Sequence, residues 1–192
     1  MQVVDPHIHL WDLKTHHYPW LANPKTSFVG DSRSLKHDYL IGDLLAEAGE
    51  IEILKLVHVD ANHDPVDPVE ETRWLQGIAD GEGRGMPNGI VAGADLSADN
   101  AAEVLEAHAA FANTRGIRQI LNVHADPLYD YVGRHYMNES MWRRNFALLR
   151  KHGLSFDLQL YPSQMRDAAA LAKEHADTQF IVELARQKWI PC

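Results

Sequence analysis

Short β-rich segments alternate with amphipathic helical segments along most of the chain. Apolar and β-branched residues predict strands at residues 3–10, 51–60, 89–96, 116–121, 154–161 and 179–182. Apolar positions at helical spacing predict helices that begin near Asp67, Ser97, Asn138 or Ser140, and Ser163, all residue types that cap helices. Residues 13–36 are expected to form a long irregular loop. The alternation predicts an α/β fold with a parallel sheet.

Two parallel architectures fit this alternation, a (β/α)8 barrel and a doubly wound open sheet. No glycine-rich phosphate loop follows the first predicted strand, so the nucleotide-binding form of the open sheet lacks its main feature. Polar residues at the strand ends favour the barrel, because its active sites lie at the carboxyl ends of the strands.

In the first predicted strand, residues two apart share a face, so Asp5, His7 and His9 should point to the same side. The apolar residues of the opposite face, which include Val4 and Ile8, are expected to pack against helices. The pair His7 and His9 could reach one divalent ion, and zinc, which favours nitrogen ligands, is the ion expected. The alternative is that both imidazoles are simply packed at a strand end.

Two further residues are candidates for substrate binding. Arg118 could bind a carboxylate or a lactone oxygen with its planar guanidinium, or it could form a structural ion pair with Asp95 or Asp157. Tyr161 could donate to a substrate oxygen, or it could close the core.

Other histidines and aromatic residues are less informative. His58 is expected to be a hydrogen-bonded core residue, and the loop pair His16 and His17 is expected to be solvated. Three aromatic residues of the first loop could line a pocket or merely pack the loop down: Trp11, Tyr18 and Trp20. His124 and Asp126 follow the fourth predicted strand and could face the barrel mouth.

Composition narrows the class of protein. With 192 residues, 45% of them hydrophobic and 23% charged, the chain is expected to form one domain with a real core. The net charge of -9 and the lack of a basic stripe argue against nucleic acid or membrane partners and leave a small-molecule substrate. The single Cys192 excludes an internal disulfide, and no secretion signal is visible, so the cytoplasm is the simplest location.

The segment Val4-Asp5-Pro6-His7-Ile8-His9-Leu10-Trp11-Asp12, followed by Tyr18-Pro19-Trp20-Leu21, resembles the opening of the amidohydrolase-2 family. Its members are regarded as metal-dependent TIM-barrel hydrolases related to fuconolactonase and 2-pyrone-4,6-dicarboxylate lactonase. Further matches lie at residues 57–61, 70–75, 115–118 and 153–159, so the resemblance runs from about Val3 to Glu183. It implies lactone hydrolysis at a barrel mouth, with His7 and His9 as metal ligands and Arg118 and Tyr161 as substrate-binding residues.

The resemblance breaks off after Glu183. The family would continue there with a sixth-strand histidine, but Leu184 stands in its place, and the last-strand aspartate that serves as metal ligand or base has no counterpart. We therefore expect about six of the eight barrel units in a partial domain of residues 1–183. We expect an aberrant or truncated tail at 184–192, and no catalytic base can be assigned.

Three functional hypotheses follow. The first is a hydrolase of lactone-type cyclic esters, whose activity is either intact or impaired by the loss of the C-terminal strands. The second is an inactive barrel fragment that associates with itself or with a partner through its open sheet edges. The third is another amidohydrolase-type enzyme, such as a decarboxylase, amidase or phosphoesterase, because the two histidines alone do not separate these reactions.

Overall fold

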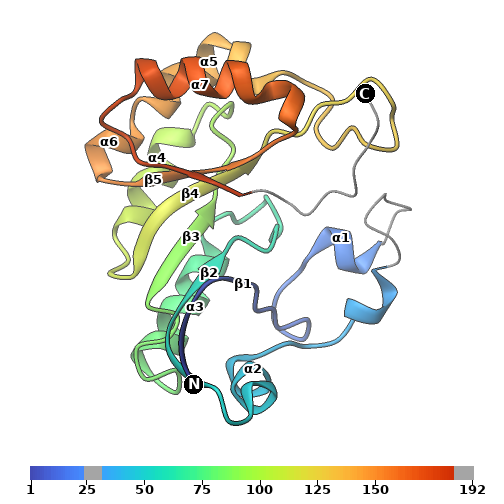
Figure 1. Cartoon of the computed structure of the whole chain (residues 1–192), viewed down its shortest axis with the longest axis vertical. Helices are drawn as coiled ribbons and strands as arrows, with labels where there is room; N and C mark the ends of the chain where they lie inside the picture. The colour runs from blue at the N-terminus through green and yellow to red at the C-terminus, as the bar shows by residue number, and fades with distance from the viewer. Residues whose placement is uncertain (24–31, 184–192) are drawn as a thin grey trace.

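The computed structural model of the chain describes residues 1–23 and 32–183, and its centre is a curled, all-parallel sheet (Figure 1). Neighbouring strands follow one another in chain order, β1-β2-β3-β4-β5-β6. The strands are β1 (Gln2–Ile8), β2 (Glu52–Val59), β3 (Gly89–Gly93), β4 (Thr114–Ile120), β5 (Ser155–Gln159) and β6 (Phe180–Val182). This confirms the predicted α/β fold and the incomplete (β/α)8 barrel, and all six predicted strands are present.

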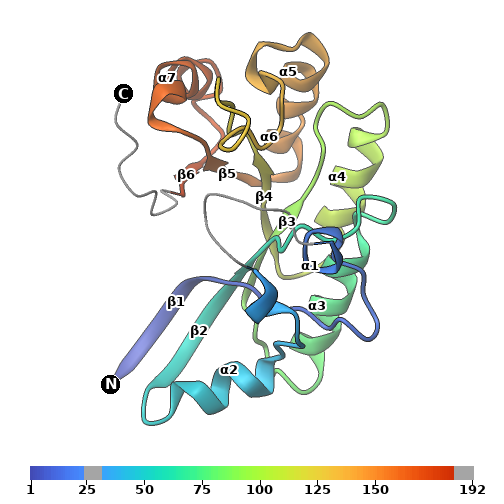
Figure 2. The same ribbon diagram turned by 90° about the vertical axis from the view of Figure 1, so that its right-hand side faces the viewer.

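Helices cover the outer side of the curled sheet (Figure 2): α2 (Ile41–Ala48), α3 (Glu70–Asp80), α4 (Ala101–Ala109), α5 (Ser140–Phe146), α6 (Leu149–His152) and α7 (Met165–Glu174). The short helix α1 (Pro19–Ala22) belongs to the first loop, and its Trp20 donates to the Ala61 carbonyl just after β2. Short 3-10 turns occupy Arg33–Leu35, Tyr136–Asn138 and Pro162–Gln164. Within the described residues, no helix has the length and apolar character needed to cross a membrane.

Two helix starts lie later than predicted. Asp67 accepts a hydrogen bond from the Val69 amide in a turn before α3, and the helix begins at Glu70. Ser97 likewise donates its hydroxyl to Asp95 at 2.6 Å, and α4 begins at Ala101. Short polar side chains compete with helix formation in this way, because they offer the local backbone another bonding pattern.

The unpredicted helix α2 has an identifiable signal. The backbone amide of Leu40 donates to the Asp43 carboxylate at 2.8 Å, which satisfies one of the free donors at the helix start. Gly49, with φ of 57°, ends the helix, because glycine adopts this conformation without a Cβ clash. The apolar side chains Ile41 and Leu44 then pack against β2 and α3 residues in the core.

The larger core lies between the sheet and helices α4 to α7. Trp142 and Phe146 of α5 pack against Phe156 of β5, with ring centroids 5.9 Å and 5.0 Å from it. Phe180 of β6 stacks on Phe146 at 5.5 Å. These aromatic contacts hold the later strands to their outer helices and thereby orient the strand ends.

The first strand departs from simple alternation. Its register with β2 shifts between Val3 and Val4 and again between Asp5 and Ile8. Val4 was predicted to pack against helices, but 57% of it is exposed, whereas Val3 lies beside α2. The prediction was wrong because the register shifts reverse the faces near the start of the strand and because the inner side of the sheet is open there.

Candidate active site

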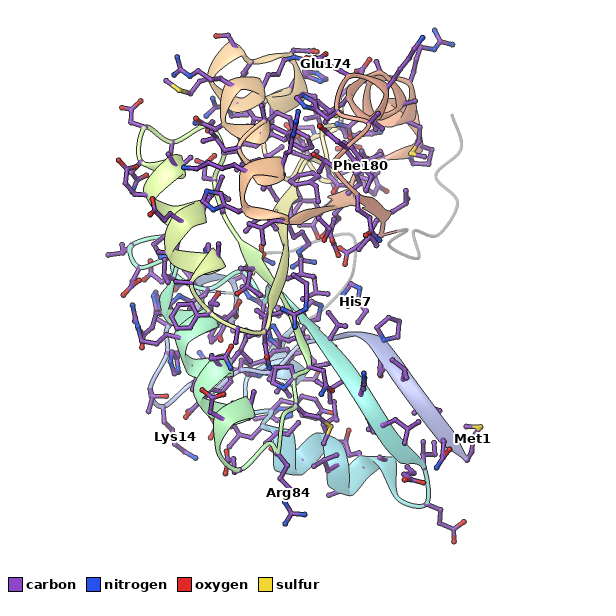
Figure 3. All side chains as sticks on the ribbon, turned by 90° about the vertical axis from the view of Figure 1, so that its left-hand side faces the viewer. Met1, His7, Lys14, Arg84, Glu174 and Phe180 are labelled. Carbon is purple, nitrogen blue, oxygen red and sulfur yellow. The ribbon has the colours of Figure 1, made fainter. Side chains whose placement is uncertain are left out.

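His7 lies near the carboxyl end of β1, on the side that faces β6 (Figure 3), and His9 follows just after the strand, in contact with it. Their Nε2 atoms are 3.2 Å apart, and the ring planes meet nearly edge to face. The predicted convergence of the two imidazoles is therefore present in the structure. Their role as metal ligands stays a prediction.

The bonding partners of these rings determine which nitrogen carries the proton. Nδ1 of His9 lies 2.7 Å from the carbonyl oxygen of Val59, which can only accept, so Nδ1 is the donor. Nδ1 of His7 lies 3.0 Å from the Glu183 carboxylate and donates to it in the same way. In the neutral rings, each Nε2 atom then carries a lone pair, and the two atoms lie 3.2 Å apart. A shared proton or a cation there would satisfy both atoms.

The donor set fits part of a zinc site. Among residues 1–23 and 32–183, no group of three or more His, Cys, Asp or Glu side chains is placed to hold a metal ion. Catalytic zinc normally takes three protein ligands, and the two Nε2 atoms provide two. Burial, followed by the nearby Arg118 charge, lowers the pKa of His9 to about 4, so this ring is neutral and able to coordinate at pH 7.

Arg118 of β4 is buried at the centre of a charge network. Its guanidinium donates to the backbone carbonyl of Asp60, lies 3.4 Å from the Asp60 carboxylate and lies 3.5 Å from Glu183. Gln159 accepts a further bond from it at 3.0 Å. The predicted alternative of an ion pair with Asp95 or Asp157 is not what the structure shows, because the carboxylates that approach it follow β2 and β6.

Two buried carboxyl groups near this network carry raised pKa values. Burial and the Glu183 charge raise the pKa of Asp157 to about 7. Burial, with the Asp60 charge, raises the pKa of Glu71 well above its usual range, although the Ala61 amide donates to it. Burial raises the pKa in this way because it disfavours the charged form of a carboxyl group.

A pocket of about 530 Å³ opens above the carboxyl ends of β2, β3 and β4. Aromatic walls come from Trp20, Tyr131 and Tyr136. Its polar lining includes Asp60, Asn62, His63, Glu71, Asp95, Arg118 and Gln119. Arg118 thus belongs both to this pocket and to the network that reaches His7 through Glu183, which joins the two parts of the candidate site.

Tyr161, the second predicted substrate-binding residue, is buried just after the end of β5. Its hydroxyl donates to the carbonyl oxygen of Tyr129 at 2.5 Å, and its ring contacts that of His124. These are the contacts of a residue that closes the core. Its proposed role in substrate binding stays a prediction that no contact here supports.

Among the other histidines, the structure confirms the prediction for His58 and contradicts the one for His16. His58 is a buried core residue, as expected, with Nε2 3.2 Å from the Leu10 carbonyl. His17 is exposed, but the His16 side chain is only 7% exposed and lies against Trp74 and His63, so its expected solvation was wrong. The loop folds back because aromatic and imidazole rings gain from removal from water.

The sequence did not identify three acidic residues of the site: Asp60, Glu71 and Glu183. Asp60 and Glu183 each stand directly after a strand, so a carboxylate at the carboxyl end of a parallel strand was a readable signal. Glu71 lies in α3, where an acidic residue in the first turn normally suits the helix dipole, and nothing distinguished it. Leu184 and the expected tail at 184–192 lie outside the described residues.

Comparison with known proteins agrees with the fold. The family model for amidohydrolases (Amidohydro_2) matches residues 4–183. The protein named "Uncharacterized protein y4mH" of Sinorhizobium fredii is 43% identical over 182 residues, which are 94% of this chain and 61% of that protein. The chain therefore spans less than two thirds of the length of this relative.

Solved structures share the architecture. Amidohydrolase 2 of Bifidobacterium longum subsp. infantis aligns with a TM-score of 0.64 and 21% identity, over 97% of this chain and 65% of that one. An amidohydrolase of Burkholderia multivorans, solved with bound zinc, aligns with a TM-score of 0.65 and 23% identity, over 93% of this chain and 56% of that one. Together with the family match over nearly all described residues, these findings show that the chain belongs to the amidohydrolase family.

Proposed function

We propose that the site formed by His7, His9 and Arg118 serves the hydrolysis of a lactone-type cyclic ester by activated water. The observation that carries the proposal is the juxtaposition of two convergent imidazole Nε2 atoms, 3.2 Å apart, with a buried guanidinium that lines an adjoining pocket. Ester hydrolysis needs a group that activates water and a donor for the developing oxyanion, and these residue types supply both.

The residues of the chain have separate roles in this proposal. A divalent ion held by His7 and His9, with zinc as the ion these ligands favour, would supply Lewis acidity and a nucleophile at neutral pH. Arg118 orients the ester carbonyl, because its guanidinium is rigid and permanently charged. Asp60 and Glu183 hold that guanidinium in place, and Val59 and Glu183 fix the two imidazole tautomers.

Charge favours a neutral substrate. Asp60 and Glu183 both lie within 3.5 Å of Arg118 and offset its positive charge, and Asp95 also lines the pocket. Among the side chains of the pocket and its network, an additional carboxylate on the substrate would meet three carboxylates, those of Asp60, Glu183 and Asp95, and one guanidinium, while the divalent ion would lie at the imidazoles. This balance supports a neutral lactone over an aromatic acid, and so favours ester hydrolysis over the alternative decarboxylase reaction.

The test is a substrate panel assayed with the chain in the presence of zinc. We expect neutral sugar lactones to be opened and aromatic acids not to be decarboxylated. His9→Ala should abolish lactone opening, Arg118→Gln should raise KM, and His17→Ala, which changes an exposed imidazole away from the site, should leave both unchanged. Decarboxylation without lactone opening, or lactone opening that survives His9→Ala, would contradict the proposal.

A second candidate function is binding without catalysis, through the open edges of the sheet. The observation that favours it is exposed apolar surface on both edge strands, at Val4 of β1 and at Ile181 and Val182 of β6, with exposed Leu54 on the neighbouring β2. Parallel sheets are normally covered on both faces, so this surface is expected to have a partner. Absence of turnover on every substrate, together with stable association, would favour this function over hydrolysis.

A further inference from the structure

We propose that Glu71 is a specificity-determining residue, whose buried carboxyl group receives a hydroxyl substituent of the substrate ring. The inference rests on the proposed function and concerns a residue that the proposed reaction does not use. Glu71 lies in the first turn of α3, is 3% exposed and lines the same pocket as Arg118. A ligand in that pocket can therefore touch both residues.

The contacts of Glu71 leave most of its hydrogen-bonding capacity unused. Its two oxygens divide one backbone donor, the Ala61 amide, at 3.4 Å and 3.3 Å, which is beyond the usual range for such bonds. A carboxylate can accept about four bonds. The adjacent Glu70 instead forms an ion pair with Arg73 at the helix surface, whereas no ion pair reaches Glu71 within residues 1–23 and 32–183. A buried carboxyl group with so few partners is costly, so its place in a pocket wall calls for an occupant.

Two further buried polar atoms in this region lack partners. The Tyr18 hydroxyl and Nδ1 of His63 form no hydrogen bond with the part of the chain that the structure describes. Their rings lie 5.3 Å apart, and His63 also lines the pocket. Burial, followed by the nearby Glu71 carboxyl, raises the pKa of Tyr18, so the hydroxyl lies close to that carboxyl without the geometry of a hydrogen bond to it. Unpaired buried polar atoms of this kind usually mark the position of a bound water or ligand.

A hydroxyl group matches these partners better than a charged group does. It can donate to the Glu71 carboxyl and accept from the Tyr18 hydroxyl at the same time. An ammonium group can only donate, and burying its charge costs much more than burying a hydroxyl. A carboxylate would meet Asp60 as well as Glu71, and the Asp60 charge already raises the pKa of Glu71 in addition to burial.

The backbone after β2 connects Glu71 to the proposed reaction centre. Arg118 donates to the Asp60 carbonyl, and the amide of the next residue, Ala61, points to Glu71. The Ala61 carbonyl accepts the Trp20 indole at 2.7 Å, and Trp20 forms a wall of the pocket. A ring that fits the pocket can thus place its ester carbonyl at Arg118 and a substituent at Glu71.

The experiment measures binding of lactams, which are more resistant to hydrolysis than lactones. The probes are 2-pyrrolidinone, its 3-hydroxy and 4-hydroxy derivatives, and its 3-amino derivative. They are titrated into the chain and followed by NMR, which also reports whether the ring stays closed. We expect one hydroxylated lactam to bind at least about tenfold more tightly than 2-pyrrolidinone and than the amino derivative, as a hydrogen bond to a carboxylate provides.

Variants of the chain assign this preference to Glu71. Glu71→Met should abolish the preference for the hydroxyl, and Glu71→Gln and Tyr18→Phe, which conserve side-chain shape, should each reduce it. Glu70→Met, in the same helical turn, is the matched control and should keep the preference. Circular dichroism checks the fold of each variant, and the two shape-conserving variants carry the test if Glu71→Met does not fold.

Equal binding of the plain and hydroxylated lactams would overturn this inference and leave the proposed hydrolysis standing. Tighter binding of the amino derivative would replace it with a cation site, and a preference that survives in the folded Glu71 and Tyr18 variants would remove these residues from it. If no lactam binds, this inference and the proposed function both fail. A hydroxyl preference in a chain that opens no lactone would support Glu71 as a binding residue and count against the hydrolysis alone.

Discussion

Glu183, the residue after β6, accepts a hydrogen bond from His7 at the end of β1, with Oε1 3.0 Å from Nδ1. The contact connects the first and sixth strands across the inner side of the curled sheet. The same carboxylate lies 3.5 Å from Arg118 of β4. One acidic residue therefore links the imidazole pair to the guanidinium, and the site depends on the sheet being curled.

Glu183→Gln should destabilise the chain by about 1–3 kcal/mol, because it removes a buried charge between two positively polarised partners. Glu139→Gln, which breaks the more exposed pair with Arg134, should cost no more than about 1 kcal/mol. Urea unfolding of the two variants measures the difference. Equal and small losses would show that Glu183 does not support the network.

Because of Asp157, the free energy of unfolding should decrease as the pH rises from 4 to 7. Its pKa is raised from 3.8 to about 7, so over this range the folded carboxyl keeps a proton that the unfolded one has released. The native state binds more protons, and its stability decreases as the pH rises, by at most about 1.4 kcal/mol per pH unit.

Asp157→Asn should remove this dependence, because the amide is uncharged at every pH. The measurement is the difference in unfolding free energy between the two chains at pH 4, 5, 6 and 7. Subtraction cancels the titration of the other groups. A difference that stays constant across the range would contradict the raised pKa.

Gly93→Ala should disturb the position of Asp60. A Cβ at Gly93 would lie 2.6 Å from Oδ1 of Asp60, which accepts the Asn62 amide and whose carboxylate neighbours Arg118. We expect a loss of about 1–3 kcal/mol. Gly77→Ala in α3, where nothing lies within 4 Å, should instead be neutral or stabilising by up to about 1 kcal/mol. Thermal unfolding of both variants measures the difference. A Gly77→Ala chain that is less stable than the Gly93→Ala chain would contradict this interpretation.

Zinc uptake should depend on the imidazole pair. We expect equilibrium dialysis to find one ion bound per chain, with the affinity reduced at least tenfold in His9→Ala and in His7→Ala. His17→Ala should bind as the unchanged chain does, since its exposed ring pairs with Asp64. Equal uptake by all four chains would show that zinc binds at a site other than His7 and His9.

Much of the fold was predictable because local patterns coincide with it. β-rich segments separated by amphipathic helices indicate a parallel sheet, and all six strands lie where the pattern placed them. Helix ends were less predictable at Asp67 and Ser97, since a short polar side chain can either cap a helix or close the turn before it.

The candidate site was predictable in part. The spacing of His7 and His9 determined their convergence, because alternate residues of a strand share a face. Nothing local determined that Arg118 would meet Asp60 and Glu183, which are far from it along the chain. Nor did the loop sequence show that His16 would be buried against Trp74, since its burial comes from rings on another element.

The sequence by itself determined the order of the strands and of most helices and brought His7 and His9 to the same side, because these follow from short-range periodicity. The tertiary structure alone decided which charges neutralise Arg118, which carboxyl groups have raised pKa values, and which apolar side chains of β1 and β2 stay exposed. Those properties depend on distances between strands that are remote in the chain and on how far the sheet curls, and no local pattern encodes either quantity.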